Sequence, residues 1–305
     1  MITNDAIHCH SLEDALAIQF GNNTRIAKTR RVHGGDINQA FELELQDGMC
    51  LFLKANTKEH LSFFTAEAAG LAAIAGTDTI RTPEILGKGT VEEDGGYSFL
   101  LMEFVNEKQR RHDFWETFAC ELAGMHQAGT DGLVPGGNYG FFQDNYIGAS
   151  RQQNTAYGSW IPFFCDCRLK PQLQKAAHYF NPGVKEKIPV LLGRAKEILI
   201  EPDKPSLLHG DLWSGNFITG KDHTAWLIDP AAYVGHAEAD LAMTELFGGF
   251  PKAFYDAYQT AAPLAPGYKS RRDLYNLYHL LNHLNLFGKS YLPSVERMIA
   301  NILNA

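Results

Sequence analysis

Three side chains that could carry out phosphoryl transfer lie close together in the sequence. Asp211 and Asn216 are five positions apart, and Asp229 directly follows an apolar run. A kinase needs one carboxylate that receives the proton of the attacking hydroxyl, together with an amide and a second carboxylate that hold Mg²⁺ on ATP. Mg²⁺ prefers oxygen ligands and usually takes one or two carboxylates from the protein. The spacing therefore predicts Asp211 as the base, and Asn216 and Asp229 as the metal ligands.

The residues around these side chains predict a hairpin that directs them into one cleft. An apolar pair leads into a turn at Gly210, a strand begins at Asn216, and a second strand covers 225–228 after a polar turn. Taken singly, each of the three polar residues is also typical of a turn or of the position before a proline. Their combination at kinase spacing, with His209 before Asp211, favours the catalytic interpretation.

The composition of the chain restricts its class. The 305 residues are 45% hydrophobic and carry a net charge of −8, with five cysteines. This length and hydrophobicity predict one large or two modest domains with a proper core. The negative charge argues against a nucleic-acid partner, and the absence of a run of about 18 apolar residues argues against a membrane span. The first residues lack a signal-peptide pattern and the cysteine count is odd, so we expect a cytoplasmic protein with reduced thiols.

Residues 1–105 are predicted to form a small antiparallel sheet with one helix. Period-two alternation indicates two strands joined by a turn, a helical stretch follows, and an apolar run typical of a buried strand ends this region. The predicted ranges are, in order, 41–45 and 49–54 for strands, 60–75 for the helix and 97–105 for the last strand.

From about residue 106 the pattern becomes helical. Residues 131–160 lack periodicity but are rich in aromatics, which predicts a long, ordered loop. A small sheet followed by a larger, mainly helical body predicts an α+β, two-lobed protein-kinase-like shape, with 1–105 as the nucleotide-binding lobe and 106–305 as the catalytic and substrate lobe. Helical periodicity is found at 114–128, 160–180, 184–200, 239–247, 251–261, 271–287 and 294–303.

Two further segments are expected to contact ATP. Between the lobes, the backbone of Glu103, Phe104 and Val105 could pair with the edge of adenine. Gly34 and Gly35 interrupt two strand-like segments, and glycines let backbone amides approach phosphates closely. The same glycine pair is also typical of an ordinary hairpin turn.

An ion pair between strand and helix is predicted beside the phosphates. Lys54 ends an apolar strand, and Glu67 lies in the helix that follows. In kinases a strand lysine contacts the ATP phosphates and is held by a helix glutamate. The alternatives are a surface lysine with a solvated glutamate, or Glu59 as the partner, although Glu59 lies at the helix start, where glutamate is common as a cap. The apolar context of Lys54 favours the functional pair.

The segment from His209 to Asn216 resembles the catalytic loop of the fructosamine kinases, also called ketosamine kinases. The segments 138–169 and 235–250 resemble the same family, so that the resemblance spans most of the chain in order. It implies a protein-kinase-like fold. It also implies ATP-dependent phosphorylation of the third sugar hydroxyl of ketosamines on amines or proteins, which destabilises the adduct and helps to free the amine.

The resemblance carries roles over to individual positions. Asp240 matches a buried helix aspartate that hydrogen-bonds the backbone of the catalytic loop, although a cap at the start of a helix is the alternative. His209 is expected, like Asp240, to give structural support to the site. The remaining matches are Asp211 as the base, Asn216 and Asp229 as metal ligands, and Lys54 with Glu67 as the nucleotide clamp.

The chain departs from its relatives at two positions. Several relatives carry a cysteine at the position of Asp36 that is linked to redox-controlled dimers, which puts that regulation in doubt here. Pro230 follows Asp229 in place of a Phe-Gly pair, and no activation-loop signature comes after it. This departure argues against a protein Ser/Thr kinase.

Trp213 is a candidate substrate residue. An indole beside the base could form a wall for a sugar ring or for its cationic amine, because a ring face attracts cations; packing in the core is the alternative. The sequence also leaves open a kinase of the same fold that acts on an aminoglycoside, choline or homoserine, or a catalytically dead nucleotide-binding protein. It does not separate fructosamine, ribulosamine and erythrulosamine, free from protein-bound acceptors, or one oligomeric state from another.

Overall fold

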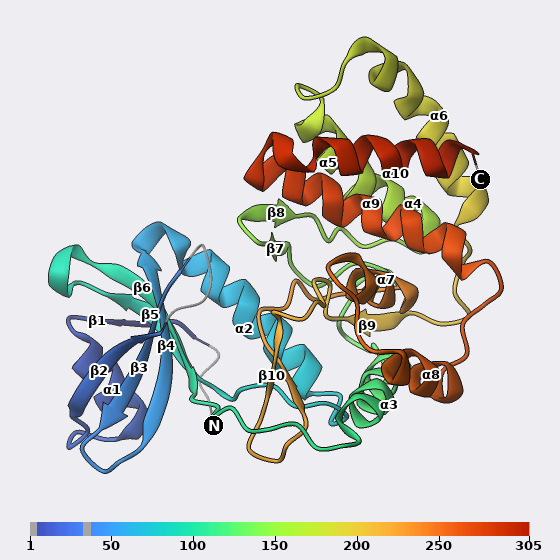
Figure 1. Ribbon diagram of the computed structural model, residues 1–305. Coiled ribbons are helices and arrows are strands. Elements are labelled where there is room, and N and C mark those ends of the chain that lie inside the picture. The colour runs from blue at the N-terminus through green and yellow to red at the C-terminus, as the bar shows by residue number, and fades with distance from the viewer. Residues whose placement is uncertain (1–4, 33–37, 305) are drawn as a thin grey trace.

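The first third of the chain forms a six-stranded sheet. The computed structural model describes residues 5–32 and 38–304, and within them the strand order is β1-β5-β6-β4-β3-β2 (Figure 1). The strands are Ile7–Cys9 (β1), Ile26–Val32 (β2), Gln39–Leu45 (β3), Cys50–Thr57 (β4), Ile85–Val91 (β5) and Tyr97–Glu103 (β6). The α-helices of this part are Leu12–Phe20 (α1) and Leu61–Ala75 (α2).

The predicted hairpin at the centre of the sheet is confirmed as β3 and β4. Leu43 pairs with Leu51, and the turn closes where a carboxylate oxygen of Asp47 accepts the Met49 N–H at 2.9 Å. The strand β6 lies on the other side of β4. Lys54 therefore extends from a strand that is hydrogen-bonded on both sides, which gives its side chain a rigid base.

The two faces of the sheet are covered by different helices. Leu101 of β6 belongs to the apolar cluster that contains Leu16 of α1, and the next residue, Met102, belongs to the cluster that contains Phe64 of α2. Successive side chains of a strand point to opposite faces. Because both faces are buried, β6 has a continuous apolar sequence rather than an alternating one.

Two details of the predicted sheet region are wrong. It contains a second α-helix, α1, which begins with a capping box: the Ser11 hydroxyl accepts the Asp14 N–H at 3.1 Å, and the Asp14 carboxylate accepts the Ser11 N–H at 3.0 Å. The sheet is also not entirely antiparallel, since β1 runs parallel to β5. Both elements are short, so they have too few residues for a clear periodic pattern.

Helices dominate the rest of the chain, as predicted. The predicted helix at 160–180 is divided by a π-helical turn at Cys165–Leu169. The α-helices are Phe114–Gln127 (α3), Trp160–Phe164 (α4), Lys170–Ala176 (α5), Pro182–Ile198 (α6), Glu238–Leu246 (α7), Lys252–Ala261 (α8), Tyr268–Phe287 (α9) and Leu292–Asn304 (α10).

Three short strand pairs lie between these helices. The predicted hairpin after the catalytic loop is confirmed as β10 and β11, and β12 is a strand that the sequence did not reveal. The loop at 131–160 is ordered, with Tyr139 and Phe141 buried. The pairs are Asn145–Ile147 (β7) with Ser150–Gln152 (β8), Ser206–Leu208 (β9) with Tyr233–Gly235 (β12), and Phe217–Thr219 (β10) with Ala225–Leu227 (β11).

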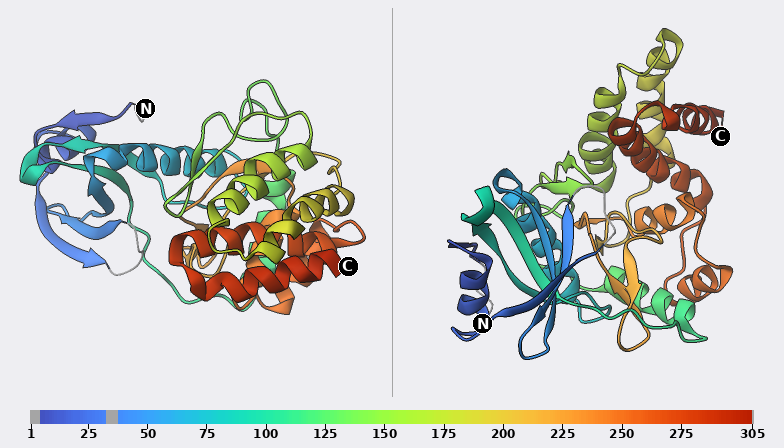
Figure 2. Two further views of the ribbon diagram at one scale, coloured as in Figure 1. Left: turned by 90° about the horizontal axis from the view of Figure 1, so that it is seen from above. Right: turned by 60° about the vertical axis from the view of Figure 1, so that its left-hand side comes forward.

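The sheet and the C-terminal helices occupy opposite ends of the molecule. Figure 2 shows α2 reaching from the sheet toward the helical part, while the chain after β6 crosses as an extended segment. Helix α2 contacts β7 of the helical part, and α9 packs against both α7 and α10. In the part of the chain that the structure describes, no helix has both the length and the apolarity needed to cross a membrane.

Candidate active site

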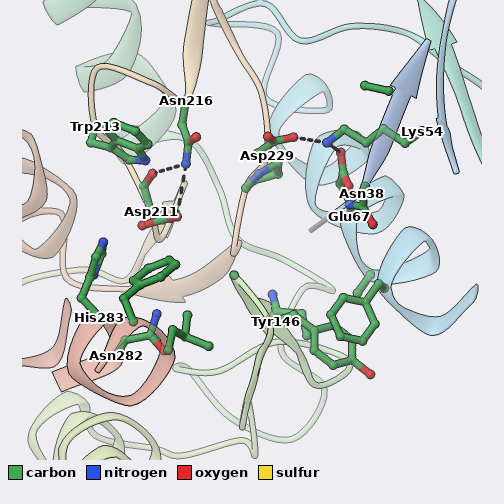
Figure 3. Close-up of a pocket in the computed structure, with 18 residues that line it drawn as sticks. Asn38, Lys54, Glu67, Tyr146, Asp211, Trp213, Asn216, Asp229, Asn282 and His283 are labelled. Atoms are coloured by element: carbon green, nitrogen blue, oxygen red, sulfur yellow. Dashed lines mark hydrogen bonds and ion pairs between the residues drawn. The ribbon is translucent and has the colours of Figure 1, made fainter. Parts of the chain in front are cut away.

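A pocket of about 330 Å³ is lined by residues from both parts of the molecule (Figure 3). Strand β4 and helix α2 contribute one side, the loops beside β10 and β11 contribute the back, and β7 and α9 contribute the other side. The lining residues are Asn38, Ala40, Lys54, Phe63, Ala66, Glu67, Asn145, Tyr146, Gly148, Asp211, Trp213, Asn216, Asp229, Pro230, Asn282, His283, Leu286 and Phe287.

At one end of the pocket a lysine lies between two carboxylates. The Nζ of Lys54 is 2.7 Å from an Oε1 of Glu67, and it also forms an ion pair with Asp229. The predicted partnership of Lys54 with Glu67 rather than with Glu59 is therefore present in the structure. We call Lys54, Glu67 and Asp229 the charged end of the pocket.

The three groups at the charged end shift one another's pKa values. Burial alone would lower the pKa of Lys54, but the charges of Asp229 and Glu67 outweigh it, so the pKa lies above its usual value and the ammonium is retained. Burial raises the pKa of Asp229, but the charge and hydrogen bond of Lys54 bring it below its usual value. Burial together with the second carboxylate raises the pKa of Glu67, although Lys54 opposes this rise.

At the other end, Asp211 lies beside Asn216. The Nδ2 of Asn216 donates to the backbone carbonyl of Asp211 at 2.8 Å and to its carboxylate at 3.2 Å. Burial raises the pKa of Asp211 to about 7, the hydrogen bond from Asn216 opposes this, and the charges of Asp229 and Asp240 add to it. A carboxylate with a pKa near neutrality is suited to accept a proton at the working pH of an enzyme.

A buried aspartate supports the backbone of this loop. The carboxylate of Asp240, on α7, accepts the backbone N–H of His209 at 2.7 Å and that of Gly210 at 2.8 Å, and the His126 ring lies 3.2 Å from it. Gly210 has φ +81°, and a Cβ at this position would collide with the carbonyl oxygen of Ala231. The loop thus requires glycine here, and Asp240 binds the loop backbone instead of capping its own helix.

His209 joins the loop to the strand that precedes Asp229. Its Nε2 lies 2.9 Å from the carbonyl oxygen of Ile228, so this nitrogen carries the proton, and its Nδ1 accepts the Asp211 N–H at 3.3 Å. Burial lowers the pKa of His209, which keeps the ring neutral. Asp229 itself has φ +53°. These contacts hold the backbone of Asp211 and of Asp229 in a fixed relation.

The donor set is suited to a hard cation. Asn216 directs its Nδ2 toward Asp211, and Figure 3 shows its amide oxygen turned toward the side of Asp229. One oxygen of Asp229 pairs with Lys54, and Figure 3 shows the second turned toward the side of Asn216. One amide oxygen and one carboxylate oxygen facing a shared space fit the preference of Mg²⁺ for oxygen ligands.

Other predicted residues lie apart from the pocket or outside the described ranges. Glu103 ends β6 and its carboxylate pairs with Lys221 at 3.0 Å, while neither it nor Phe104 and Val105 line the pocket. In the described residues, no hydrogen bond involves the backbone of Phe104 or Val105. Gly34, Gly35 and Asp36 lie outside the described residues.

Trp213 lies at the mouth of the pocket rather than in the core. Its side chain lines the pocket and remains 37% exposed, and its ring meets the edge of Phe247 at 6.5 Å between centroids. The core-packing alternative is therefore excluded. We call Asp211, Trp213 and His283 the acceptor end of the pocket, because Figure 3 shows the three on the same side, away from Lys54.

Several lining residues have no signal in the sequence. Tyr146 stacks on Phe63 with ring centroids 3.6 Å apart, and its hydroxyl lies 3.0 Å from that of Ser62, so this stack connects α2 with the helical part. Asn282 and His283 come from α9. Consecutive positions on a helix do not share a face, and the sequence of α9 does not predict what either side chain contacts.

The fold and the pocket define a phosphotransferase with a protein-kinase-like architecture. The family model described as fructosamine kinase matches residues 9–305. The chain belongs to the fructosamine kinase family. The predicted fold class is confirmed by this match and by the structural similarities that follow.

Individual relatives match nearly the whole chain. A protein named probable ketoamine kinase from Synechocystis sp. is 41% identical, over 99% of this chain and 99% of its own length. A protein-ribulosamine 3-kinase, chloroplastic, from Arabidopsis thaliana is 38% identical, over 93% and 85%. The crystal structure of a protein assigned as a fructosamine-3-kinase, from Haemophilus somnus 129PT, has a TM-score of 0.84 at 32% identity and covers 96% of this chain and 97% of its own.

The fold extends to more distant kinases. A variant of the aminoglycoside phosphotransferase APH(4)-Ia, solved as a ternary complex with ADP and hygromycin B, has a TM-score of 0.62 at 16% identity. The match covers 96% of this chain and 98% of the other. At this identity the similarity establishes a shared fold alone.

Proposed function

We propose that this protein is an ATP-dependent kinase that phosphorylates a sugar hydroxyl of ketosamines and thereby aids the removal of sugar adducts from amines. The observation that carries the proposal is the joining of a charged end and an acceptor end in one pocket, with Asp211 and Asp229 on neighbouring loops. Membership of the fructosamine kinase family supports the substrate class. The names of the relatives, ketoamine kinase and protein-ribulosamine 3-kinase, support it as well.

In this proposal each end of the pocket has one task. Lys54, held by Glu67, contacts the phosphates of ATP and offsets their charge. Asp211 orients the acceptor hydroxyl and receives its proton while the γ-phosphoryl group transfers in line. Asp240 and His209 keep the loop backbone in place and do not touch the reacting groups.

Asn216 and Asp229 are the residues that would hold Mg²⁺. When bound, the metal would neutralise charge on the phosphates. The hydrogen bond that Asn216 Nδ2 makes with the backbone carbonyl of Asp211 fixes the amide so that its oxygen is available. This arrangement couples the position of the proposed base to the position of the proposed metal ligand.

We also propose that the two parts of the chain have different functions. Residues 1–105 would bind the nucleotide and residues 106–305 would supply the catalytic loop and the acceptor site. The backbone of Phe104 and Val105 has no hydrogen bond with any other described residue, which supports their role as the adenine contact between these parts. The five cysteines are free, which supports a cytoplasmic location.

An ADP-release assay with a set of acceptors tests the proposal. Ribulosyl-lysine, fructosyl-lysine, choline and an aminoglycoside are each offered with ATP and Mg²⁺, and ADP formation is followed by a coupled reaction. We expect turnover with one or both ketosamines at a kcat/KM well above that for the other acceptors. Preferential turnover of choline or the aminoglycoside would contradict the substrate class, and ATP binding without any transfer would contradict the enzymatic function.

A further inference from the structure

His283 places a hydrogen-bond acceptor in the acceptor end of the pocket. Its Nδ1 lies 2.8 Å from the carbonyl oxygen of His279, one turn earlier on α9, so Nδ1 must carry a proton. In a neutral imidazole with a proton on Nδ1, the other nitrogen, Nε2, has a free lone pair. Burial lowers the pKa of His283, although the bond to His279 partly opposes this, and the ring therefore remains neutral near pH 7.

Surrounding rings fix the orientation of His283. Its centroid lies 4.7 Å from that of Phe247, 5.2 Å from that of Tyr291 and 5.5 Å from that of Phe287. Figure 3 shows the ring pointing from α9 toward Asp211. Among the described residues none hydrogen-bonds to Nε2. The structure thus holds an acceptor with a fixed direction at the side of the pocket where the acceptor hydroxyl would bind.

Most of the polar side chains that line the pocket already have a partner within the protein. Glu67 and Asp229 pair with Lys54, and Asp211 is bound by Asn216. The amides and the hydroxyl of the remaining polar lining residues bond within the protein, namely Asn38 with Asn56, Asn145 with Gln152 and Ala232, Asn282 with Gln172, and Tyr146 with Ser62. In the proposed function Asp211 receives the acceptor hydroxyl, and Asn216 and Asp229 hold the metal. The Nε2 of His283 is then an acceptor that is left for a second donor on the substrate.

We propose, on the basis of the proposed function, that Trp213 and His283 form a subsite for the substituted ammonium of the ketosamine. The Nε2 of His283 would accept a hydrogen bond from an N–H of this ammonium. In such a substrate the nitrogen is attached to the first sugar carbon, only a few bonds from the hydroxyl that receives the phosphate. With that hydroxyl at Asp211, the ammonium must lie close by. The exposed face of Trp213 attracts the cation, and the neutral ring of His283 accepts a hydrogen bond from the ammonium without repelling its charge.

His283 is in this view a specificity-determining residue. A ketose that carries an ether oxygen in place of the amine has the same shape but offers neither a positive charge nor an N–H. It would leave the lone pair of His283 without a donor. The subsite therefore distinguishes amine-linked sugars from plain ketoses.

Two matched substrates and three variants test this inference. The substrates are a 1-alkylamino-1-deoxyketose and the 1-O-alkyl ether of the same ketose with the same alkyl chain. His283→Leu removes the acceptor, whereas His283→Gln retains one at about the position of Nε2. The matched control is His178→Leu, because the Nδ1 of His178 also bonds a backbone carbonyl, that of Lys175 at 2.9 Å, but its side chain is exposed and does not line the pocket.

We expect His283→Leu to raise KM for the amine substrate about tenfold or more, with kcat and the KM for ATP nearly unchanged. Kinetics with the ether should not change, His283→Gln should recover part of the loss, and His178→Leu should match the wild type. Equal losses for amine and ether would overturn the role of His283 while leaving the kinase function intact. A wild-type protein that phosphorylates no ketosamine would overturn the proposed function itself, and the inference with it.

Discussion

The two ends of the pocket differ in how their polar groups are satisfied. At the charged end, the Lys54 ammonium is shared by two carboxylates, so each of the three groups has a partner of opposite charge before any ligand binds. At the acceptor end, Asp211 is held by a single amide, and aromatic faces and the Nε2 of His283 remain open. The charged end is thus organised to position a cation for phosphates, and the acceptor end is organised to recognise a substrate.

The ends also differ in the elements that build them. Lys54 and Glu67 come from β4 and α2, which adjoin in sequence and are joined by the ion pair between these two side chains. The acceptor end combines the loop after β9 with α9, and His283 follows Trp213 by 70 positions in the sequence (283 − 213). Changes in acceptor preference can therefore arise on α9 without disturbing the nucleotide contacts. The following predictions test this separation.

The largest effect is expected for Asp211→Asn. The amide keeps the size of the side chain but cannot take the proton of the acceptor hydroxyl, so kcat should fall by about 10²–10⁴-fold. Nucleotide affinity, measured by calorimetric titration, should stay close to that of the wild type because the charged end is intact. Turnover within tenfold of the wild type would remove Asp211 from the role of base.

A smaller effect is expected for Lys54→Met, and it should appear in nucleotide binding rather than in kcat. Loss of a charge-assisted contact with phosphate should raise KM for ATP about 10–100-fold, while KM for the ketosamine changes little. The control is Lys28→Met, since Lys28 lies on the exposed edge strand β2. Equal increases in both KM values would show that the two ends are not separable.

Trp213→Ala should affect KM for the ketosamine rather than KM for ATP, the reverse of Lys54→Met. Removal of the exposed ring face should raise KM for the ketosamine by roughly tenfold and leave KM for ATP nearly unchanged. Phe142→Ala provides the control, because Phe142 is 47% exposed but does not line the pocket. If both substrates were affected to the same degree, Trp213 would have no specific role in acceptor binding.

The smallest effect is expected for the dependence of folding stability on acidic pH. Burial lowers the pKa of His236 to about 3, so the folded protein holds this ring neutral whereas the unfolded chain protonates it below about pH 6.5. The unfolded state then binds more protons, so stability is full above pH 6.5 and declines as the pH falls toward 3. Between pH 7 and 5 this amounts to about 2 kcal/mol.

His236→Gln makes this contribution measurable. Urea unfolding at pH 7 and pH 5 should show that the variant loses less stability on acidification than the wild type, by about 2 kcal/mol. An equal loss in the two proteins would mean that His236 titrates in the folded state. His279, whose pKa burial also lowers to about 3, lies on α9 and should contribute in the same direction.

The charged end could be predicted from sequence because its residues lie on regular elements. The apolar run before Lys54 predicts a strand and the segment around Glu67 predicts a helix, and the structure brings the two side chains together, although β4 continues beyond Lys54 to Thr57. Asp211 and Asn216 were likewise predicted, since their spacing on one loop determines that they are neighbours. Their chemical roles remain predictions that the kinetic experiments test.

The acceptor end could be predicted only in part. Trp213 was found because it adjoins Asp211 in sequence, whereas His283 and Tyr146 reach the pocket through contacts between distant segments. Nothing local to α9 indicates that His283 faces Asp211 rather than the core. Short elements such as α1 and β12 were missed for a different reason, because a few residues give no clear period.

The most direct test of the account is to locate the ketosamine relative to the proposed metal site. With Mn²⁺ in place of Mg²⁺ and a non-hydrolysable ATP analogue bound, paramagnetic broadening of a ¹³C-labelled ketosamine is measured by NMR. We predict strong, nucleotide-dependent broadening that is greatest at the sugar carbon bearing the acceptor hydroxyl and weaker along the amine substituent. Absence of broadening, or broadening that is greatest at the amine substituent, would contradict a single pocket in which Asn216 and Asp229 hold the metal and Asp211 faces the sugar.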